Sequence, residues 1–443
     1  MNIQLSEHFT YKKLLRFILP SIIMMVFTSI YSVVDGIFVS NFVGKSAFAS
    51  VNLIMPYLMG ISALGFMIGT GGSAFVSKTL GEGKKELANQ YFSMLVTIAA
   101  IGGFVLSVLS FIFMRRIVMA FGAAGDLIDY CTLYGRISCI SLTAFMLQNV
   151  FQSFFVAAGK PQLGLKVIVA AGCTNIVLDA LFIGVLHFGI AGAAFATMTS
   201  ELIGGLLPVV YFFRKNDSLL HFVKPVFDRR VFLKTCTNGS SELMTNLSMS
   251  LVNALYNLQL MKIAGENGVA AYGAVMYVNF IFVATFLGYA IGCAPVISYH
   301  YGAGNHAELK NLYKKSMSII LVWGVILFGA AQLLAPVLSK IFVGYNTGLY
   351  AMTLHGFRVY AIAFLIIGIN IFGSSFFTAL NNGLISAVIS FLRTLMFQVI
   401  MVLTLPLWFG INGIWSAIGV AEALTLIMTT IFFVRQKDKY HYL

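Results

Sequence analysis

Charged residues are scarce in this sequence. Only 10% of its 443 residues are Asp, Glu, Lys or Arg, against roughly 25% in an average soluble chain. Hydrophobic residues make up 59%, and the mean hydropathy is +0.91. The apolar runs are long enough to cross the hydrocarbon core of a bilayer, which takes roughly 20 residues. The composition therefore excludes a soluble protein and predicts an integral membrane protein.

Cysteine and histidine are also few, and neither has a metal-binding pattern. The five cysteines include no CxxC pair and the seven histidines form no HExxH motif, so we interpret the cysteines as small packing residues. The triplet Gly44-Lys45-Ser46 lacks the earlier glycine of a phosphate-binding loop. With no catalytic cluster and no soluble ATP-hydrolysing domain, we predict that the protein is not an enzyme, has no cofactor and uses an ion gradient.

Lys and Arg are distributed unevenly between the predicted loops. Six lie between Arg214 and Lys234, three precede the first apolar run, and three follow the last, whereas the opposite loops hold few. By the positive-inside rule, both termini are predicted to be cytoplasmic. The net charge of +13 then requires only anionic membrane lipid as a partner, and no nucleic acid.

The sequence repeats itself after a shift of 221 positions. This shift aligns Gly81 with Gly302, Gly83 with Gly304, and residues 188–190 with residues 409–411. A single register over so much chain indicates duplication. We predict an all-α integral membrane protein with twelve transmembrane helices in two six-helix bundles. Because each bundle has an even number of spans, a pseudo-two-fold axis along the membrane normal relates them.

The predicted spans are residues 14–40, 50–77, 90–114, 130–157, 167–186 and 190–213, then 236–260, 272–299, 316–338, 350–377, 384–407 and 413–434. Helices 1–6 form a predicted N-lobe, residues 1–220, and helices 7–12 a predicted C-lobe, residues 221–443. A basic cytoplasmic linker at about residues 214–234 joins them.

Carboxylates inside the predicted spans are the strongest functional candidates, because a charge in hydrocarbon costs roughly 2.5–3.5 kcal/mol. Asp179 follows Asn175 by four residues, which places both on one helix face. Asp35 shares a face with Thr28 and Tyr31. If these faces converge, their oxygens form a pocket suited to Na⁺, or to a proton shared by the two carboxylates. The alternative is that both aspartates only bond neighbouring helices.

The second half of the chain does not repeat this acidic pair, since the matching positions hold Tyr256 and Ile400. The cation pocket is therefore predicted for the first bundle alone. Glu201 and Glu422 occupy one repeat position, which favours a common structural role. Three intramembrane arginines, whose partners the sequence does not identify, are candidate counter-ions: Arg136, Arg358 and Arg393.

The seventh predicted span carries a stripe of polar residues along one helix face: Glu242, Asn246, Asn253 and Asn257. Such a stripe either lines a wet cleft or bonds neighbouring helices. Methionine and aromatic residues could supply an adaptable apolar wall beside it. The candidate substrate-cavity residues are Tyr31, Met55, Glu242, Asn246, Asn253, Tyr256 and Met276.

Four segments together resemble the bacterial multidrug and toxic compound extrusion (MATE) family. They are residues 34–40 (VDGIFVS), the turn 81–83 with its partner 302–304, residues 175–179 (NIVLD) and residues 189–197 (GIAGAAFAT). The resemblance implies two lobes that rock between inward-open and outward-open states. It also implies a cation site made of Asp35, Asn175, Asp179 and Thr197. The acidic residues of the other family branch, inside helices seven and ten, are not matched here.

The resemblance completes a functional prediction. We expect a monomeric, multi-pass transporter in the bacterial inner (plasma) membrane that exchanges Na⁺ or H⁺ for amphipathic, often cationic organic compounds by alternating access. No metal other than Na⁺ at the cation site is expected. The alternative is a flippase or exporter of a lipid-linked precursor or an endogenous metabolite, although a flippase would be expected to have a strongly cationic cleft.

Overall fold

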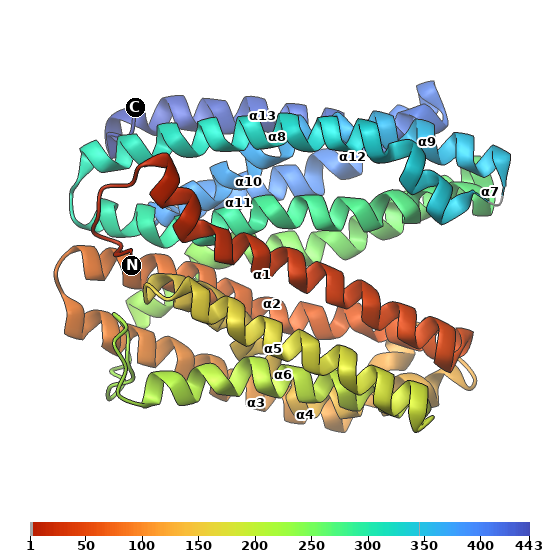
Figure 1. The fold of residues 1–443 in the computed structure, drawn as a ribbon, viewed down its shortest axis with the longest axis horizontal. Helices are drawn as coiled ribbons and strands as arrows, with labels where there is room; N and C mark the ends of the chain where they lie inside the picture. Colours follow the sequence, from red (N-terminus) through yellow and green to blue (C-terminus); the bar gives the residue numbers. More distant parts are fainter. Residues whose placement is uncertain (1–2, 345) are drawn as a thin grey trace.

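The structure, a computed structural model, describes residues 3–344 and 346–443 and consists of helices joined by short connections (Figure 1). The helices of the first half are α1 (Tyr11–Phe38), α2 (Lys45–Gly81), α3 (Lys85–Ala120), α4 (Leu127–Ala157), α5 (Pro161–Asp179) and α6 (Gly189–Phe213). Those of the second half are α7 (Arg229–Gly302), α8 (His306–Val343), α9 (Thr347–Ala361), α10 (Phe364–Ala379), α11 (Gly383–Phe391), α12 (Phe397–Phe409) and α13 (Ile411–Tyr440).

Twelve membrane spans can be assigned among the described residues, as the sequence predicts. Ten continuous helices are long and apolar enough to cross a bilayer, and the bent pair α9 and α10 supplies another span. The twelfth comes from α7, whose 74 residues comprise two helices separated at Gly265, where φ is 62°. Glycine adopts this positive φ without steric cost. The two helices within α7 are longer than the predicted spans 236–260 and 272–299, and they meet at Gly265.

The predicted span at residues 350–377 corresponds to a bent pair of helices, because α9 and α10 meet at an angle of 46°. At the bend, the amides of Ile362 and Ala363 donate to carbonyls only three residues earlier. This tighter pattern interrupts the α-helical ladder. No proline or glycine lies at the break, so the sequence carries no conventional signal for it.

Helices α1–α6 form the first bundle and α7–α13 the second (Figure 1). Their contacts follow the duplication. A Cβ atom on Gly81 would overlap the carbonyl of Tyr299, and one on Gly302 would overlap the carbonyl of Lys78. Lys78 and Tyr299 are themselves separated by the 221-residue shift. Each contact is therefore repeated with the bundles exchanged, which is the pattern produced by a two-fold axis.

Close backbone packing brings the bundles together near the end of the molecule that carries both termini, which we call the terminal end. There, Gly71 of α2 packs against Thr235 and Gly239 of α7 so closely that neither glycine could accept a Cβ atom without overlap. The side-chain amide of Asn238 donates to the carbonyls of Gly71 and Thr378 at 3.5 and 2.9 Å. In Figure 1 the bundles lie close where N and C are marked and diverge toward the opposite end.

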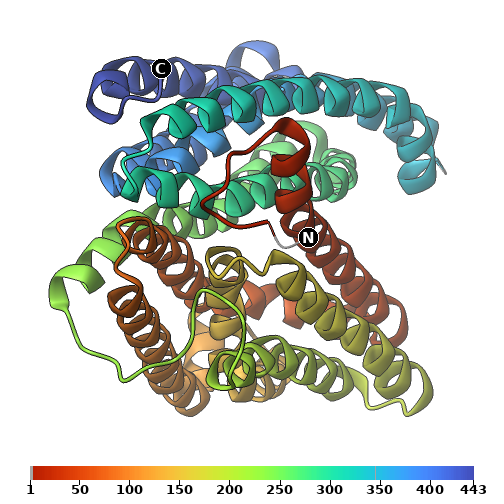
Figure 2. The same cartoon turned by 60° about the vertical axis from the view of Figure 1, so that its left-hand side comes forward.

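The chain before α1 adds a second connection at the terminal end (Figure 2). The carboxylate of Glu308, in α8, accepts from the backbone amide of Phe9 at 2.9 Å and lies 2.5 Å from the Nδ1 atom of His8. The carbonyl of Phe9 accepts from Lys315 and Asn311 at 2.6 and 3.0 Å. Phe9 is completely buried. This segment therefore ties the start of the first bundle to the second.

The connection between the bundles differs slightly from the predicted linker at 214–234, because α7 begins at Arg229. Before that residue, the connection runs along α3. Its amides at His221 and Val223 donate to Asn89 and Ser93 at 3.0 and 2.9 Å. The connection is therefore held on the first bundle.

The outer helices α3 and α8 present large apolar side chains away from the protein. Ile101 and Phe104 in α3 are 61% and 64% exposed, and the repeat-related Val322 and Val325 in α8 are both 60% exposed. Such rows have no packing role inside the chain, but lipid tails can cover them. The surface thus agrees with the hydropathy of the sequence.

Candidate functional site: buried carboxylates in the first bundle

The two predicted cation-binding aspartates lie beside irregular turns of their helices. Asp179 is the last residue of α5 and immediately precedes a π-helical segment, Ala180–Val185. Asp35 lies in the last turns of α1, shortly before a second such segment, Val39–Val43. Short π-helical segments change the direction of side chains and are common at functional sites. Both aspartates therefore occupy positions where the helix geometry is specialised.

Several oxygen atoms of this region are buried without a hydrogen-bond partner among the described residues. Asp179 is completely buried and, among the described residues, neither of its carboxylate oxygens has a partner. The Oδ1 atom of Asp35 and the hydroxyl of Thr197 are buried and unpartnered as well. Asp35 and Asp179 are close enough to interact electrostatically. Because an unpaired buried carboxylate is costly, this pair requires either a proton or a bound cation.

The structure thus brings Asp35 and Asp179 together. Asn175 lies one helical turn before Asp179. Thr197 lies in the same region, because Tyr134 is next to it and also near both aspartates. Tyr134, in α4, is almost fully buried beside Thr197 and within the electrostatic reach of Asp35 and Asp179. Asn175 is 2% exposed. Carboxylate, amide and hydroxyl oxygens are the ligands that hard cations prefer. The binding of a cation by Asp35, Asn175, Asp179 and Thr197 stays a prediction.

Sequence reasoning did not identify the α4 residues that complete this polar interior. Ser141 donates to the Oε2 atom of Glu201 at 2.6 Å. Gln148 lies beside Tyr31, whose hydroxyl is also near Asp35 and Glu201. Tyr134, Ser141 and Gln148 recur every seven residues, which places them on one helix face. The seven-residue spacing could have indicated a polar helix face. However, uncharged polar residues with this spacing are also common in ordinary helix packing.

No group of three or more His, Cys, Asp and Glu side chains in the described ranges could hold a metal ion. A tightly held resident metal normally has more protein ligands than an aspartate pair supplies.

The second bundle has a different charge arrangement around Glu422, the residue that repeats Glu201. Glu422, in α13, is completely buried, and its Oε1 atom lies 2.8 Å from the Nε atom of Arg393. Its other oxygen accepts from Asn370 at 2.7 Å, and Asn370 in turn accepts from Thr429 at 3.1 Å. The partner of Arg393, left open by the sequence, is thus Glu422.

Comparison of the repeats shows how the bundles differ. Arg393 lies in a third π-helical segment, Leu392–Met396, and its repeat position in α5 is Gly172. Glu201 is bonded to Ser141, whereas Glu422 is paired with a guanidinium. Glu201 and Glu422 were expected to share a structural role, but their side chains bind different partners. A fixed internal cation, Arg393, balances Glu422 in the second bundle, whereas the acidic pair of the first bundle has no such counter-ion among the described residues.

Replacing Arg393 by Met is expected to destabilise the protein by about 3–5 kcal/mol, because Glu422 would remain buried without its counter-ion. The double variant Arg393→Met/Glu422→Gln should recover much of this loss, since it removes both charges. Thermal unfolding of the purified variants measures the difference. A single variant as stable as the wild type would show that the pair does not stabilise the fold.

The seven candidate substrate-cavity residues do not line one described pocket. Tyr31 and Met55 belong to the first bundle and the other five to α7. Tyr256 stacks on Tyr272 with ring centres 5.1 Å apart, and the hydroxyl of Tyr272 donates to Asn253 at 3.1 Å. These groups therefore pack within the second bundle.

The other three candidates on α7, Asn246, Glu242 and Met276, are partly exposed. Asn246 donates to the backbone carbonyl of Glu242 at 2.8 Å. The Glu242 side chain lies in the field of Arg393 and has no hydrogen-bond partner among the described residues. Glu242 is thus the only one of the seven with a carboxylate that a cationic substrate could approach.

Known proteins match this chain along nearly its whole length. The MatE family model matches residues 20–181 and again residues 243–404, once in each half. The multidrug export protein MepA of Staphylococcus haemolyticus (strain JCSC1435) is 24% identical over 434 residues, covering 97% of this chain and 93% of the relative. MepA of Staphylococcus aureus (strain MSSA476) is 22% identical over 437 residues, covering 97% and 94%.

Solved structures have the same fold. An outward-facing conformation of a multidrug resistance MATE family transporter of the MOP superfamily superposes with a TM-score of 0.92 at 23% identity, covering 98% of each chain. A MOP superfamily transporter from Pyrococcus furiosus Vc1 (DSM3638) gives a TM-score of 0.89 at 24% identity, covering 97% of each chain.

Proposed function

Because the chain belongs to the MatE family of membrane transporters, we propose that it exports amphipathic, often cationic organic compounds in exchange for Na⁺ or H⁺. One observation carries this proposal: among the described residues, both carboxylate oxygens of the buried Asp179 and the Oδ1 atom of the nearby Asp35 have no hydrogen-bond partner. Protonation or cation binding would remove the cost of this charge. The printed names of the relatives, multidrug export proteins, support the substrate class.

The coupling site is assigned to the first bundle alone. Asp35 and Asp179 would hold the ion, with Asn175 and Thr197 as the neutral oxygen ligands. In the second bundle, Arg393 neutralises Glu422 and is covalently part of the chain, so no exchangeable cation is needed there. Loading and unloading would therefore change the charge of one bundle only.

The lobes at residues 1–220 and 221–443 are proposed to move as the two units of alternating access. With both termini on the cytoplasmic side, the close packing of Gly71 and Gly239 would close the cytoplasmic face. On that orientation, this state would be outward-facing. Transport would require the cation and the organic substrate to favour different states, because a ligand with equal affinity for both states shifts neither.

The substrate is proposed to bind between the lobes, near the partly exposed Glu242. Glu242 offers a negative charge to a cationic substrate, whereas methionine side chains such as Met55 and Met276 can adapt to different apolar shapes. A flippase of lipid-linked precursors is less well supported, since it would need a cationic surface for its anionic substrate.

Vesicles containing the purified protein and a fluorescent lipophilic cation test the proposal. We expect dye export to follow an imposed Na⁺ or H⁺ gradient of the correct direction, and to stop when that gradient is removed. The effective gradient identifies the coupling ion. Equal dye movement with and without either gradient would contradict cation-coupled export.

A further inference from the structure

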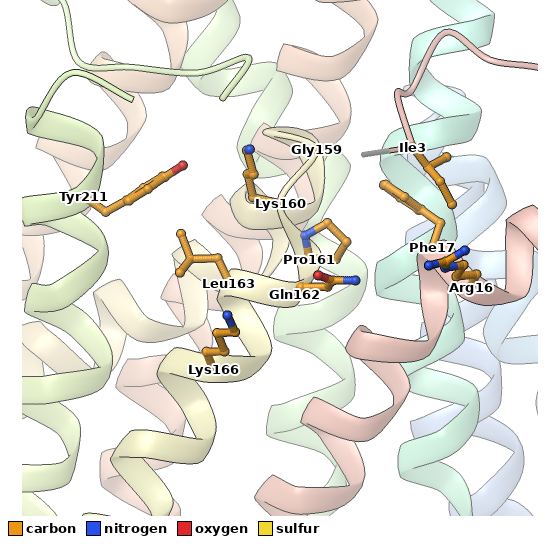
Figure 3. Close-up of a pocket in the computed structure, with 10 residues that line it drawn as sticks. All are labelled: Ile3, Arg16, Phe17, Gly159, Lys160, Pro161, Gln162, Leu163, Lys166 and Tyr211. Atoms are coloured by element: carbon orange, nitrogen blue, oxygen red, sulfur yellow. The ribbon is translucent and has the colours of Figure 1, made fainter. Parts of the chain in front are cut away.

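A cavity of about 270 Å³ opens at the terminal end of the first bundle, away from the buried carboxylates. Figure 3 shows the start of α5 between α1, which contributes Arg16 and Phe17, and α6, which contributes Tyr211. The α5 side supplies Lys160 and Lys166. Three cationic side chains thus line one cavity, and none of its described lining residues is acidic.

Two of these three cations remain available. The Nζ atom of Lys160 lies 2.8 Å from a carboxylate oxygen of the exposed residue Asp217, which partly offsets its charge. Arg16 and Lys166, which are exposed, have neither an ion pair nor a side-chain hydrogen bond within the described part of the chain. They approach the cavity from different helices. Two unpaired cations facing one hollow favour an anionic ligand.

The start of α5 adds to this preference. The helix begins with Pro161, and no side chain in the described part of the chain caps its first amides. The N-terminal end of a helix carries a partial positive charge that attracts anions, phosphate in particular. The dipole of α5 and the charges of Arg16 and Lys166 therefore all favour the binding of an anion.

The apolar part of the cavity indicates what kind of anion would bind. Ile3, Phe17 and Leu163 form part of its wall. Leu15 and Leu19, on the neighbouring surface of α1, are 42% and 51% exposed. A free inorganic anion would gain nothing from these surfaces, whereas a lipid could place its glycerol and acyl chains along them. The volume is close to the lower limit of small-molecule sites, roughly 300 Å³.

We propose that this pocket binds the phosphate headgroup of an anionic phospholipid in the leaflet next to the terminal end. Basic pockets between transmembrane helices on the cytoplasmic side bind such headgroups. A bound lipid would bridge α1, α5 and α6 and so stabilise the terminal end of the first bundle. The inference depends on the placement of these residues at the membrane surface and is independent of the transported substrate.

Native mass spectrometry of the full chain in detergent tests the proposal with phosphatidylglycerol, phosphatidylcholine and inorganic phosphate as probes. The wild type should bind phosphatidylglycerol more tightly than phosphatidylcholine. The double variant Arg16→Gln/Lys166→Gln should weaken phosphatidylglycerol binding by roughly 30-fold, because two headgroup contacts are lost. Inorganic phosphate at the same concentration should not displace the lipid.

The matched control is Lys310→Gln/Lys314→Gln, which removes two exposed cations of α8 outside the cavity. We expect it to retain the wild-type affinity for phosphatidylglycerol. Equal losses in both double variants would reveal a diffuse charge effect and overturn the site. Equal binding of the two lipids, or displacement by inorganic phosphate, would overturn the assignment to an anionic phospholipid.

Discussion

Replacing Asp179 by Asn should reduce cation-driven dye export at least about 30-fold while leaving the protein folded. The substitution removes one of two carboxylates that would hold the coupling ion, and losing one member of a close buried charge contact costs roughly 2–5 kcal/mol. Initial rates of export from proteoliposomes, at equal protein density, measure the effect. Asp35→Asn should show a loss of similar size because the two carboxylates act on the same ion.

Stability separates loss of coupling from misfolding. Asp179 is buried and neither carboxylate oxygen has a hydrogen-bond partner in the described chain, so its neutral amide replacement removes a desolvated charge. The thermal unfolding midpoint of Asp179→Asn should therefore be no lower than that of the wild type. Asp129→Asn is the control, since the side chain of Asp129 is 78% exposed, and it should retain export. Unchanged export by Asp179→Asn would exclude this residue from the coupling site.

A leucine at Gly71 should prevent the bundles from closing at the terminal end. A Cβ atom there would overlap backbone atoms of Thr235 and Gly239, and backbone overlap cannot be relieved by a change of rotamer. We expect the closed state to lose about 3 kcal/mol or more relative to a state with the bundles separated there. This corresponds to a change of roughly 100-fold in the population ratio. Export should fall because one of the two alternating states is lost.

Spin labels at Lys84 and Ala307, in or next to the turns at the terminal end, would report this change as a longer interlabel distance. Gly102→Leu is a matched control in α3, where an added Cβ atom meets no other atom within 4 Å. It should keep both the wild-type distance and the wild-type export rate. Gly71→Leu with an unchanged distance would show that the glycine contact does not control closure.

The duplication was the most informative sequence feature for the fold. The shift of 221 predicted two related bundles, and it also relates Gly81 to Gly302 and Lys78 to Tyr299, which form the reciprocal contact described above. The family, the transporter class and the absence of enzymatic activity are confirmed by the MatE match. The positions of the cytoplasmic termini and the lobe boundary at residues 220 and 221 stay predictions.

The helix ends and breaks were less predictable. Hydropathy marks the apolar part of a helix and misses polar turns that continue it, as in α13, which runs through Arg435 to Tyr440. The π-helical segment around Arg393 and the bend between Ala361 and Phe364 have no glycine or proline signal. Their geometry depends on how neighbouring helices pack, which a single sequence does not specify.

The candidate site was predictable where it involves charge. A carboxylate inside an apolar run stands out, so Asp35 and Asp179 were found directly, and their equivalents in the second repeat showed which bundle holds the pair. The pairing of Arg393 with Glu422 was not predictable, because it requires knowing which faces of two distant helices meet. Tyr134 and Gln148 were missed because neutral polar residues are common in helix packing.

Reciprocal coupling tests the central claim most directly: an outward dye gradient should drive a cation into vesicles that contain the protein in its proposed orientation. With no cation gradient imposed, the wild type should take up Na⁺ or H⁺ as dye leaves. The double variant Asp35→Asn/Asp179→Asn should not, whereas Arg393→Met/Glu422→Gln should still do so if it folds. Dye movement without cation uptake in the wild type, or persistent uptake in the double aspartate variant, would contradict a coupling site at Asp35 and Asp179.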